Sequence, residues 1–181
     1  LTQLKLGREQ AVVSGRHILV SVALSASDRV DPVKVYSAGG ALDTPRTFWA
    51  RPNEVFYLVG IGCAVRLSGD GPDSFERIAT EYRRLVDEAV IDAPGIRGTG
   101  PVFIGGTRFD ASFAKSDLWR DFPDASLVLP SVLFTRSEGE DWFTVNILVS
   151  PETDVDAEAR DALALVDAAA RDASVESRQP A

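Results

Sequence analysis

Two segments carry apolar residues at three- and four-residue spacing, which predicts amphipathic helices. The first helix is expected over residues 73–90, with Asp73 as its N-cap and Glu76 three residues later, as in a capping box. Pro94-Gly95 marks its end. The second is expected from Ser150-Pro151, because serine suits the N-cap and proline suits the first helical position. The expected buried stripes are Phe75, Ile78, Ala79, Tyr82, Leu85, Val86 and Ala89 in the first helix, and Val155, Ala159, Ala162, Leu163, Val166, Ala169 and Ala170 in the second.

Short apolar runs occupy much of the remaining chain and predict strands. They cover residues 17–24, 101–110, 125–135 and 141–149, and residues 55–67, which form either a long strand or a tight pair of strands. The last two runs should pair as an antiparallel hairpin across the polar segment 137–140. Pro130 cannot donate a backbone hydrogen bond, so it marks an edge or a bulge. Residues 36–53 contain glycines and prolines and are expected to form a loop, from which Phe48 and Trp49 dock on the core.

Strands in hairpins together with two helices predict an α+β fold rather than a βαβ array. We therefore expect a mainly antiparallel sheet with two helices. A length of 181 residues suits one domain, which is expected over residues 1–173. The polar tail, residues 174–181, is expected to be a linker or a frayed end.

Composition narrows the possible partners and the compartment. The net charge is -8 and no basic stripe is present, so the sequence predicts no nucleic-acid partner. Cys63 is the single cysteine, which fits a reducing compartment and rules out an internal disulfide. No apolar run is long enough for a bilayer and no leader is recognised, so we expect a cytoplasmic protein without a membrane partner. The chain begins with Leu1 and has no methionine, which indicates either a non-standard start codon or a missing N-terminus.

Two glycine pairs invite a nucleotide-binding interpretation, but their context does not support it. Such a site needs its glycines between a strand and the start of a helix. Gly60-Ile61-Gly62 is instead followed by strand-like residues, so a close-packed or bulged strand is predicted. Gly105-Gly106 also lies within a predicted strand, where glycine usually lets another backbone approach.

The reactive side chains do not form a complete catalytic set. His17, the only histidine, has no nucleophile elbow to serve, and Cys63 lies in an apolar run, where it is expected to act as a small hydrophobe. Asp154, Asp156 and Glu158 suit the start of a helix better than a metal site. Asp110 is the most interesting single carboxylate, although a turn residue is the simpler interpretation. We therefore predict no catalytic, cofactor-binding or metal-binding residue in this chain.

The segment Trp119 to Pro123 has the pattern W-x-x-F-P, with Phe122 as its second aromatic residue. It is expected to form an aromatic lid over the following hairpin. If Trp119 is buried, its removal should cost roughly 3–5 kcal/mol.

The order of four segments resembles the N-terminal half of the isochorismate synthases, within the family of chorismate-utilising enzymes. The resemblance spans roughly residues 45–149 and rests on order and spacing rather than on one motif. The four segments are Thr47-Phe48-Trp49 with residues 56–64, the helix at 73–90, residues 105–110, and residues 119–130 followed by a strand ending near Trp142.

The resemblance implies that this chain is the N-terminal part of the family's sandwich fold. In that family a lysine base, a glutamate acid and further glutamates that hold Mg²⁺ lie in the C-terminal half, so no catalytic residue is carried over. The implied partners are chorismate, as substrate of the full-length enzyme, and the missing catalytic half. The implied function is the non-catalytic portion of an isochorismate synthase, which supplies menaquinone or siderophore biosynthesis.

Two alternatives remain open. The chain could be a stand-alone scaffold or binding module, or part of a sister enzyme such as a salicylate or anthranilate synthase. The Leu-Leu-Glu-Ser motif of tryptophan-regulated anthranilate synthases does not occur here, which favours an isochorismate or salicylate synthase over an anthranilate synthase.

Overall fold

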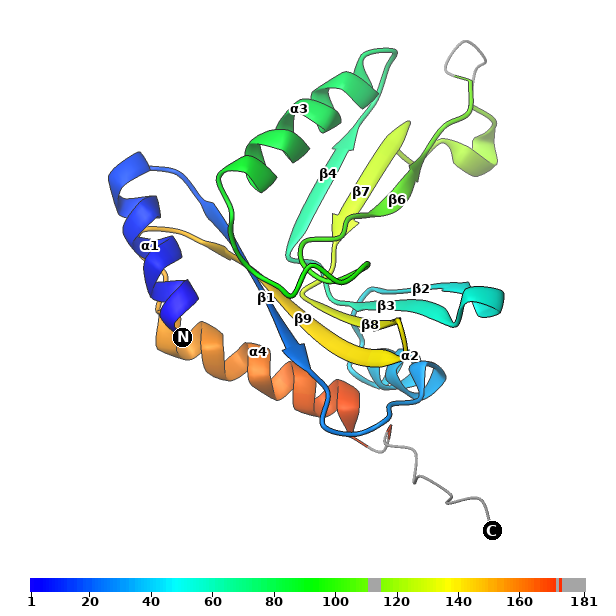
Figure 1. Ribbon diagram of the computed structural model, residues 1–181. Coiled ribbons are helices and arrows are strands. Elements are labelled where there is room, and N and C mark those ends of the chain that lie inside the picture. The colour runs from blue at the N-terminus through cyan, green and yellow to red at the C-terminus, as the bar shows by residue number, and fades with distance from the viewer. Residues whose placement is uncertain (111–114, 172, 174–181) are drawn as a thin grey trace.

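The computed structural model describes residues 1–110, 115–171 and 173, whose strands form two sheets (Figure 1). The strands are β1 (Ile18–Ser25), β2 (Arg46–Arg51), β3 (Phe56–Ile61), β4 (Val65–Gly69), β5 (Val90–Asp92), β6 (Ile104–Thr107), β7 (Ala125–Leu129), β8 (Val132–Ser137) and β9 (Glu140–Val149). The larger sheet has the order β2-β3-β8-β9-β1-β5, and the smaller has the order β4-β7-β6. Among the described strands all pairs are antiparallel except β1 with β5. The predicted α+β class with mainly antiparallel sheets is therefore confirmed.

One corner connects the two sheets. β3 pairs with β8 in the larger sheet, and their continuations β4 and β7 pair in the smaller one. Gly62 interrupts the chain between β3 and β4 with φ 74°, a conformation that favours glycine. Pro130 lies between β7 and β8. Pro130, predicted to mark an edge or a bulge, instead divides the strand predicted over residues 125–135 into β7 and β8. The segment 55–67, predicted as a long strand or a tight pair of strands, forms two strands that belong to different sheets.

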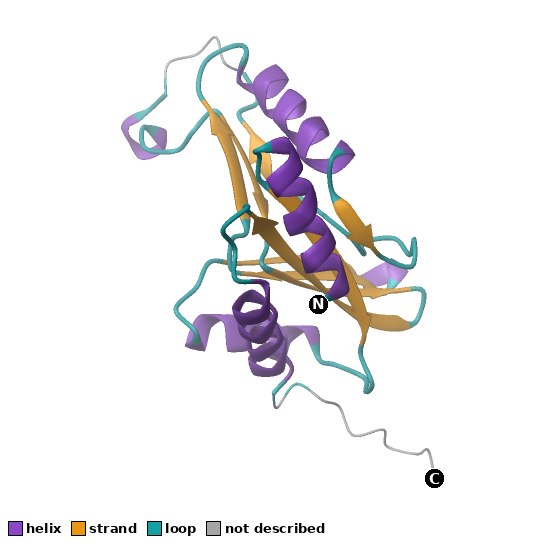
Figure 2. Cartoon of the chain, turned by 90° about the vertical axis from the view of Figure 1, so that its left-hand side faces the viewer, coloured by secondary structure: helices purple, strands orange, loops and turns teal. Residues whose placement is uncertain are grey.

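Helices cover one face of each sheet (Figures 1 and 2). The helices α1 (Thr2–Ser14), α2 (Pro32–Ala41) and α4 (Val155–Ala170) pack on the larger sheet, and α3 (Ser74–Asp87) packs on the smaller one. Phe134, Val35 and Ala169 belong to the core under α2 and α4. Ile78 and Leu85 of α3 are buried against Leu129 in the core of the smaller sheet.

The prediction of two helices is wrong, because four α-helices occur among the described residues. α1 buries Leu4, Gly7 and Ala11, so its contact face consists largely of small residues rather than an apolar stripe. A Cβ on Gly7 would lie 2.4 Å from Val20, which shows how closely this helix approaches the sheet. α2 begins with Asp31 as N-cap and proline at the first position, a start signal that its glycines obscured.

The loop predicted over residues 36–53 is also wrong, because it contains the end of α2 and all of β2. Phe48 and Trp49 do not dock on the core and are 41% and 43% exposed on the outermost strand of the sheet. Their rings pack edge-on against Tyr36 and Phe56 instead. Every residue of β2 is exposed or only partly buried, so this edge strand has no alternating apolar pattern that distinguishes it from a loop.

The final helix begins later than the sequence indicated. Asp154, rather than Ser150, is the N-cap of α4, and its carboxylate accepts hydrogen bonds from the backbone N–H groups of Asp156 and Ala157. The predicted stripe is largely correct, but Leu163 is half exposed and Leu165 packs on the core in its place. The expected tail 174–181 lies outside the described residues.

A buried ion pair joins the larger sheet to the loop before α2. Arg136 donates from Nε to Asp141 Oδ1 at 2.6 Å and from Nη2 to Asp141 Oδ2 at 2.7 Å. Arg136 also donates to the Val30 carbonyl, and the Val30 N–H donates to Asp141 at 2.9 Å. The Asp141 carboxylate raises the pKa of Arg136 above its ordinary value. The pair therefore satisfies both charges internally, as burial requires.

Candidate functional site

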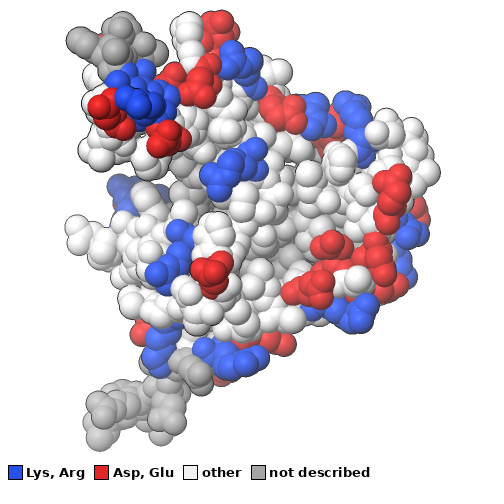
Figure 3. Space-filling view, turned by 180° about the vertical axis from the view of Figure 1, so that it is seen from behind, with Lys and Arg blue, Asp and Glu red and all other residues white. Residues whose placement is uncertain are grey.

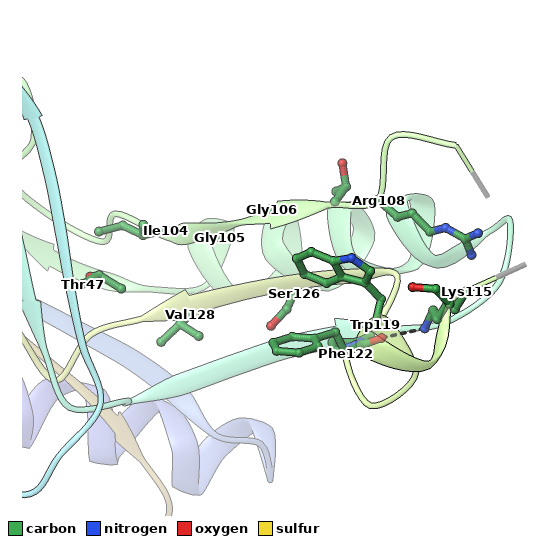
Figure 4. Close-up of a pocket in the computed structure, with 13 residues that line it drawn as sticks. Thr47, Ile104, Gly105, Gly106, Arg108, Lys115, Trp119, Phe122, Ser126 and Val128 are labelled. Atoms are coloured by element: carbon green, nitrogen blue, oxygen red, sulfur yellow. Dashed lines mark hydrogen bonds between the residues drawn. The ribbon is translucent and has the colours of Figure 1, made fainter. Parts of the chain in front are cut away.

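A large hollow lies between the two sheets, on the side where β2 and β6 face one another (Figures 3 and 4). Its volume is about 760 Å³. We call it the intersheet hollow, and its lining residues are Thr47, Ile104, Gly105, Gly106, Thr107, Arg108, Lys115, Ser116, Trp119, Phe122, Pro123, Ser126 and Val128. Figure 3 shows uncharged side chains over much of this side of the molecule, with charged side chains gathered at its margins and a few near its middle.

The floor of the intersheet hollow is the face of the smaller sheet that α3 leaves uncovered. Register places Ile104 opposite Val128 and Gly106 opposite Ser126, so these four residues share that face. A Cβ on Gly105 would lie only 1.9 Å from the Ser126 carbonyl oxygen. The predicted close backbone approach is therefore confirmed at Gly105. Gly106 has nothing within 4 Å of its missing Cβ, so it keeps the hollow open instead.

Trp119 and Phe122 form one wall of the intersheet hollow. Their ring centroids are 5.4 Å apart, and Figure 4 shows both side chains beside Ser126 and Val128. The W-x-x-F-P segment thus lies next to the predicted hairpin strand, but the side chains are not buried. Each is 58% exposed, so Trp119 is not buried by the described residues, and its burial in the full-length enzyme stays a prediction.

Two cations at the hollow are already engaged by carboxylates. Lys115 Nζ lies 2.8 Å from Asp70 Oδ1 and 3.1 Å from Asp124 Oδ1, and Arg108 Nη1 lies 3.3 Å from the same Asp124 oxygen. Lys115 also donates to the Phe122 carbonyl at 2.6 Å. This network ties the aromatic wall to the turn after β4. The cations act here as structural ties, because their charges are balanced within the chain.

The same network shifts the acidities of its members. A hydrogen bond from the Gly71 backbone N–H, followed by one from Lys115, holds the pKa of Asp124 below its ordinary value. Lys115 lowers the pKa of Asp70 in the same way, and the hydrogen bond to Asp70 raises the pKa of Lys115. Each shift favours the charged form, whereas a general acid or base needs a pKa near the working pH. The arrangement is suited to holding a loop rather than to proton transfer.

The single reactive residues considered from sequence are not brought together at the intersheet hollow. His17 is exposed just before β1, and Asp110 lies in the loop after β6. Cys63 is exposed at the corner between β3 and β4, so the expectation of a buried hydrophobe in a strand is wrong. Glycine at the preceding position turns the chain there, which explains its exposure.

The described residues do not fit a metal ion. Within the described ranges, no group of three or more His, Cys, Asp or Glu side chains is placed to hold one. Asp70 and Asp124 meet at the hollow, but Lys115 lies between them and neutralises them. In addition, no described helix is long and apolar enough to cross a membrane.

Sequence reasoning did not identify Thr47, Arg108 and Lys115 as neighbours in one hollow. Thr47 belongs to the larger sheet and the other two flank the smaller one, so only tertiary structure joins them. The signal that was available is the W-x-x-F-P segment, whose aromatic residues proved to form the wall.

Comparison with known proteins places this fold in a family. A family model described as chorismate binding enzyme matches residues 7–181. The chain belongs to the chorismate binding enzyme family. This confirms the family resemblance drawn from the four ordered segments. The match begins within α1 and therefore includes both sheets and the intersheet hollow.

Two curated relatives have informative names. The chain is 34% identical over 135 residues to a protein of Pseudomonas aeruginosa named salicylate biosynthesis isochorismate synthase, which covers 75% of this chain and 26% of that protein. It is 23% identical over 137 residues to isochorismate synthase MenF of Bacillus subtilis, covering 72% of this chain and 29% of that protein. The aligned part is thus less than a third of each relative's length. A solved structure of MenF, the menaquinone-specific isochorismate synthase from Escherichia coli, matches 99% of this chain and 35% of that chain, with 15% identity and a TM-score of 0.46.

Proposed function

We propose that this chain is the non-catalytic portion of an isochorismate synthase, which converts chorismate to isochorismate. The observation that carries the proposal is the 34% identity to a protein named as an isochorismate synthase, together with the family match over residues 7–181. The name of the second relative supports the same activity. The product would supply menaquinone or siderophore biosynthesis, in the cytoplasm, and chorismate would be the substrate of the whole enzyme.

The chemistry of the described residues supports a non-catalytic role. Adding water to one ring position and removing a hydroxyl from another needs a general base and a general acid. The polar groups at the intersheet hollow are two paired cations, two paired carboxylates and a few hydroxyls. We propose that none of the catalytic residues lies in this chain. Its sheets would support the rest of the enzyme and keep the active site rigid.

Magnesium would be held elsewhere in the same enzyme. Mg²⁺ prefers oxygen ligands in octahedral geometry and would bridge carboxylates to the substrate carboxylate. The described carboxylates are not grouped in that way. We therefore propose that no residue of this chain holds the metal.

Two other functions make different predictions. A sister enzyme would form salicylate or, with an ammonia source, anthranilate, whereas a stand-alone scaffold would convert nothing. The first relative is named for salicylate biosynthesis and for isochorismate synthase together. Isochorismate as the released product is thus the outcome that separates the proposal from both alternatives.

The test is product analysis on the natural gene product that contains this chain. Incubation with chorismate and Mg²⁺ should yield isochorismate, identified by chromatography, with or without ammonia. The 1–181 chain alone should yield none, because acid and base groups each contribute on the order of 10²–10⁴-fold in rate. Anthranilate formed only with ammonia, or salicylate with pyruvate, would assign a sister enzyme. Loss of chorismate in the presence of 1–181 alone would overturn the non-catalytic role.

A further inference from the structure

Two strand connections cross from one sheet to the other at the same corner. The chain passes from β3 to β4 at Gly62 and from β7 to β8 at Pro130 (Figure 1). A Cβ on Gly62 would lie 2.8 Å from Ser131 Oγ. A Cβ on Gly60 would lie 2.6 Å from Pro130 Cγ. The two connections are therefore in direct contact.

A buried side-chain amide ties this corner to the larger sheet. Asn146 of β9 is 2% exposed, and its Nδ2 donates to the Pro130 carbonyl at 2.9 Å. Its backbone N–H donates to the Ser131 carbonyl at 2.9 Å, and its Oδ1 accepts from Ser21 Oγ of β1 at 2.7 Å. Since a carbonyl oxygen only accepts hydrogen bonds, the contact with Pro130 fixes which side of the amide faces the corner. Asn146 thus joins β1 and β9 to the junction between β7 and β8.

Packing at the corner is apolar and incomplete. Leu19 and Leu148 of the larger sheet lie in the same core as Leu129 of β7. Apolar contact is non-directional, so it holds surfaces together over a range of angles. A second hollow, of about 290 Å³, borders the corner and is lined in part by Ser131 and Asn146. Packing therefore leaves space for the corner to bend, and the directional hydrogen bonds of Asn146 oppose that bending.

The hydrogen bonds of Asn146 contribute more to specificity than to stability. Burying an amide costs free energy that its hydrogen bonds largely offset, so the net gain is small. Buried polar groups can instead select one arrangement among several of similar stability. Because hydrogen bonds weaken steeply when they bend, the three bonds of Asn146 are satisfied together only over a narrow range of corner positions.

We propose that Asn146 is a positioning residue, which fixes the angle between the two sheets and thereby the geometry of the active site in the natural gene product. Ser21 assists by orienting the Asn146 amide. This rests on the proposed function, in which the sheets support catalytic residues that lie outside this chain. A displacement of about 1 Å at a reacting centre can lower a rate by about 10²-fold, so a small change in the angle would reach catalysis.

Paired spin labels on the natural gene product measure the arrangement of the sheets directly. Thr80→Cys on α3 and Ala164→Cys on α4 place one label beside each sheet at exposed positions. Accessible native cysteines, Cys63 among them, are replaced by serine. In this background Asn146→Leu should broaden or shift the distribution of distances between the labels. A distribution identical to that of the parent would overturn the proposal.

Two further variants separate positioning from general destabilisation. Ser21→Ala removes only the hydroxyl that orients the amide, and it should change the label distances in the same direction as Asn146→Leu. If Asn146→Leu does not fold, Ser21→Ala decides, and parental distances would then overturn the proposal. Thr144, two residues before Asn146 on the same face of β9, is fully buried and its Oγ1 has no partner among the described residues. Thr144→Val should keep the parental distances, and an effect equal to that of Asn146→Leu would contradict a specific role of the amide.

Steady-state kinetics give a readout that a merely structural role would not move. With chorismate and Mg²⁺, well below the unfolding midpoint, Asn146→Leu should lower kcat and kcat/KM by the same factor, of about tenfold or more. An unchanged KM is expected because the alignment of the reacting groups is lost rather than binding. Thr144→Val should keep the parental kcat. A parental kcat in Asn146→Leu, or a loss that matches only the fraction of unfolded protein, would overturn the proposal.

The two proposals can fail separately. Altered label distances in a protein that makes no isochorismate would reject the enzyme assignment alone. Isochorismate formation with distances and kcat unchanged by Asn146→Leu would reject the positioning role and leave the enzyme assignment intact.

Discussion

The two sheets of this chain differ in how their faces are covered. The larger sheet has three helices on one face and buries Phe134, Val59 and Ile61 completely beneath them. The smaller sheet has α3 on one face, but its other face forms the floor of the intersheet hollow, beside half-exposed aromatic rings. The helix-covered face of the larger sheet is therefore buried as in a complete domain core, whereas the uncovered face of the smaller sheet is accessible for further contact.

Their ion pairs differ in the same way. Arg136 and Asp141 are buried in the larger sheet, with side chains 10% and 4% exposed. Beside the smaller sheet Lys115 is 21% exposed, and its two partners Asp124 and Asp70 are 10% and 67% exposed. Breaking a buried ion pair lowers stability strongly, because the remaining charge stays buried without a partner. At an exposed pair, water replaces the lost partner and the loss of stability is small. Stability should therefore depend mainly on the larger sheet.

The largest predicted effect comes from breaking the buried pair. Asp141→Leu leaves Arg136 buried without its carboxylate and should lower the free energy of unfolding by about 3–5 kcal/mol. The double variant Arg136→Met/Asp141→Leu removes the stranded charge and should recover part of that loss. Urea unfolding followed by circular dichroism measures both. A cost below about 1 kcal/mol for the single variant would contradict the view that this sheet dominates stability.

A smaller effect is expected at the glycine pair of β6. Gly105→Ala places a methyl group 1.9 Å from the Ser126 carbonyl oxygen, so the strands must separate, at a cost of about 1–3 kcal/mol. Gly106→Ala meets nothing within 4 Å and should change stability by less than about 0.5 kcal/mol. Thermal unfolding of both variants provides the comparison. Equal costs at the two positions would show that β6 and β7 are not packed as described.

Sequence patterns predicted the elements whose signals are local. α3 has alternating three- and four-residue spacing, and β8 and β9 have a hairpin pattern, so both were found. α1 was not found because close packing on Val20 requires the small residues Gly7 and Ala11 rather than large apolar ones. Gly7 and Ala11 are buried because they contact the sheet, and a search for regularly spaced large hydrophobic residues does not detect small ones.

The intersheet hollow was harder to predict than the fold. Its wall was visible as the W-x-x-F-P segment, but burial of Trp119 depends on whether another surface covers it. Its floor and opposite side come from β6, β7 and Thr47 of β2, which are distant in sequence and belong to different sheets. The corner at Gly62 and Pro130 sets their relative position, and neither residue alone specifies the angle between the sheets.

Trp119→Ala tests the contrast between the exposed wall beside the smaller sheet and the buried core of the larger sheet. In the 1–181 chain it should cost less than about 1 kcal/mol, since the side chain is already 58% exposed. Phe134→Ala, at a fully buried position of the larger sheet, should cost about 3–5 kcal/mol and is the matched control. Urea unfolding gives both values. A large cost for Trp119→Ala in 1–181 would mean that its wall is more closely packed than the structure describes.

The smallest predicted effect is a pH dependence of the network beside that wall. Asp124 and Asp70 have folded pKa values below those of the unfolded chain, where aspartate has a pKa of about 3.9. As the pH falls below about 4, the unfolded state therefore binds protons first and stability decreases, until the folded carboxylates are protonated as well. Asp124→Asn cannot be protonated in this range, so the difference in urea midpoint between this variant and the parent should be largest near pH 6 and should shrink by roughly half or more on reaching pH 3. Asp117→Asn removes a carboxylate that is 91% exposed and pairs with Arg120 outside this network, so it serves as the control for the loss of a surface charge. A constant difference between Asp124→Asn and the parent across this range would show that the ionised carboxylate does not hold the turn after β4 to the aromatic wall.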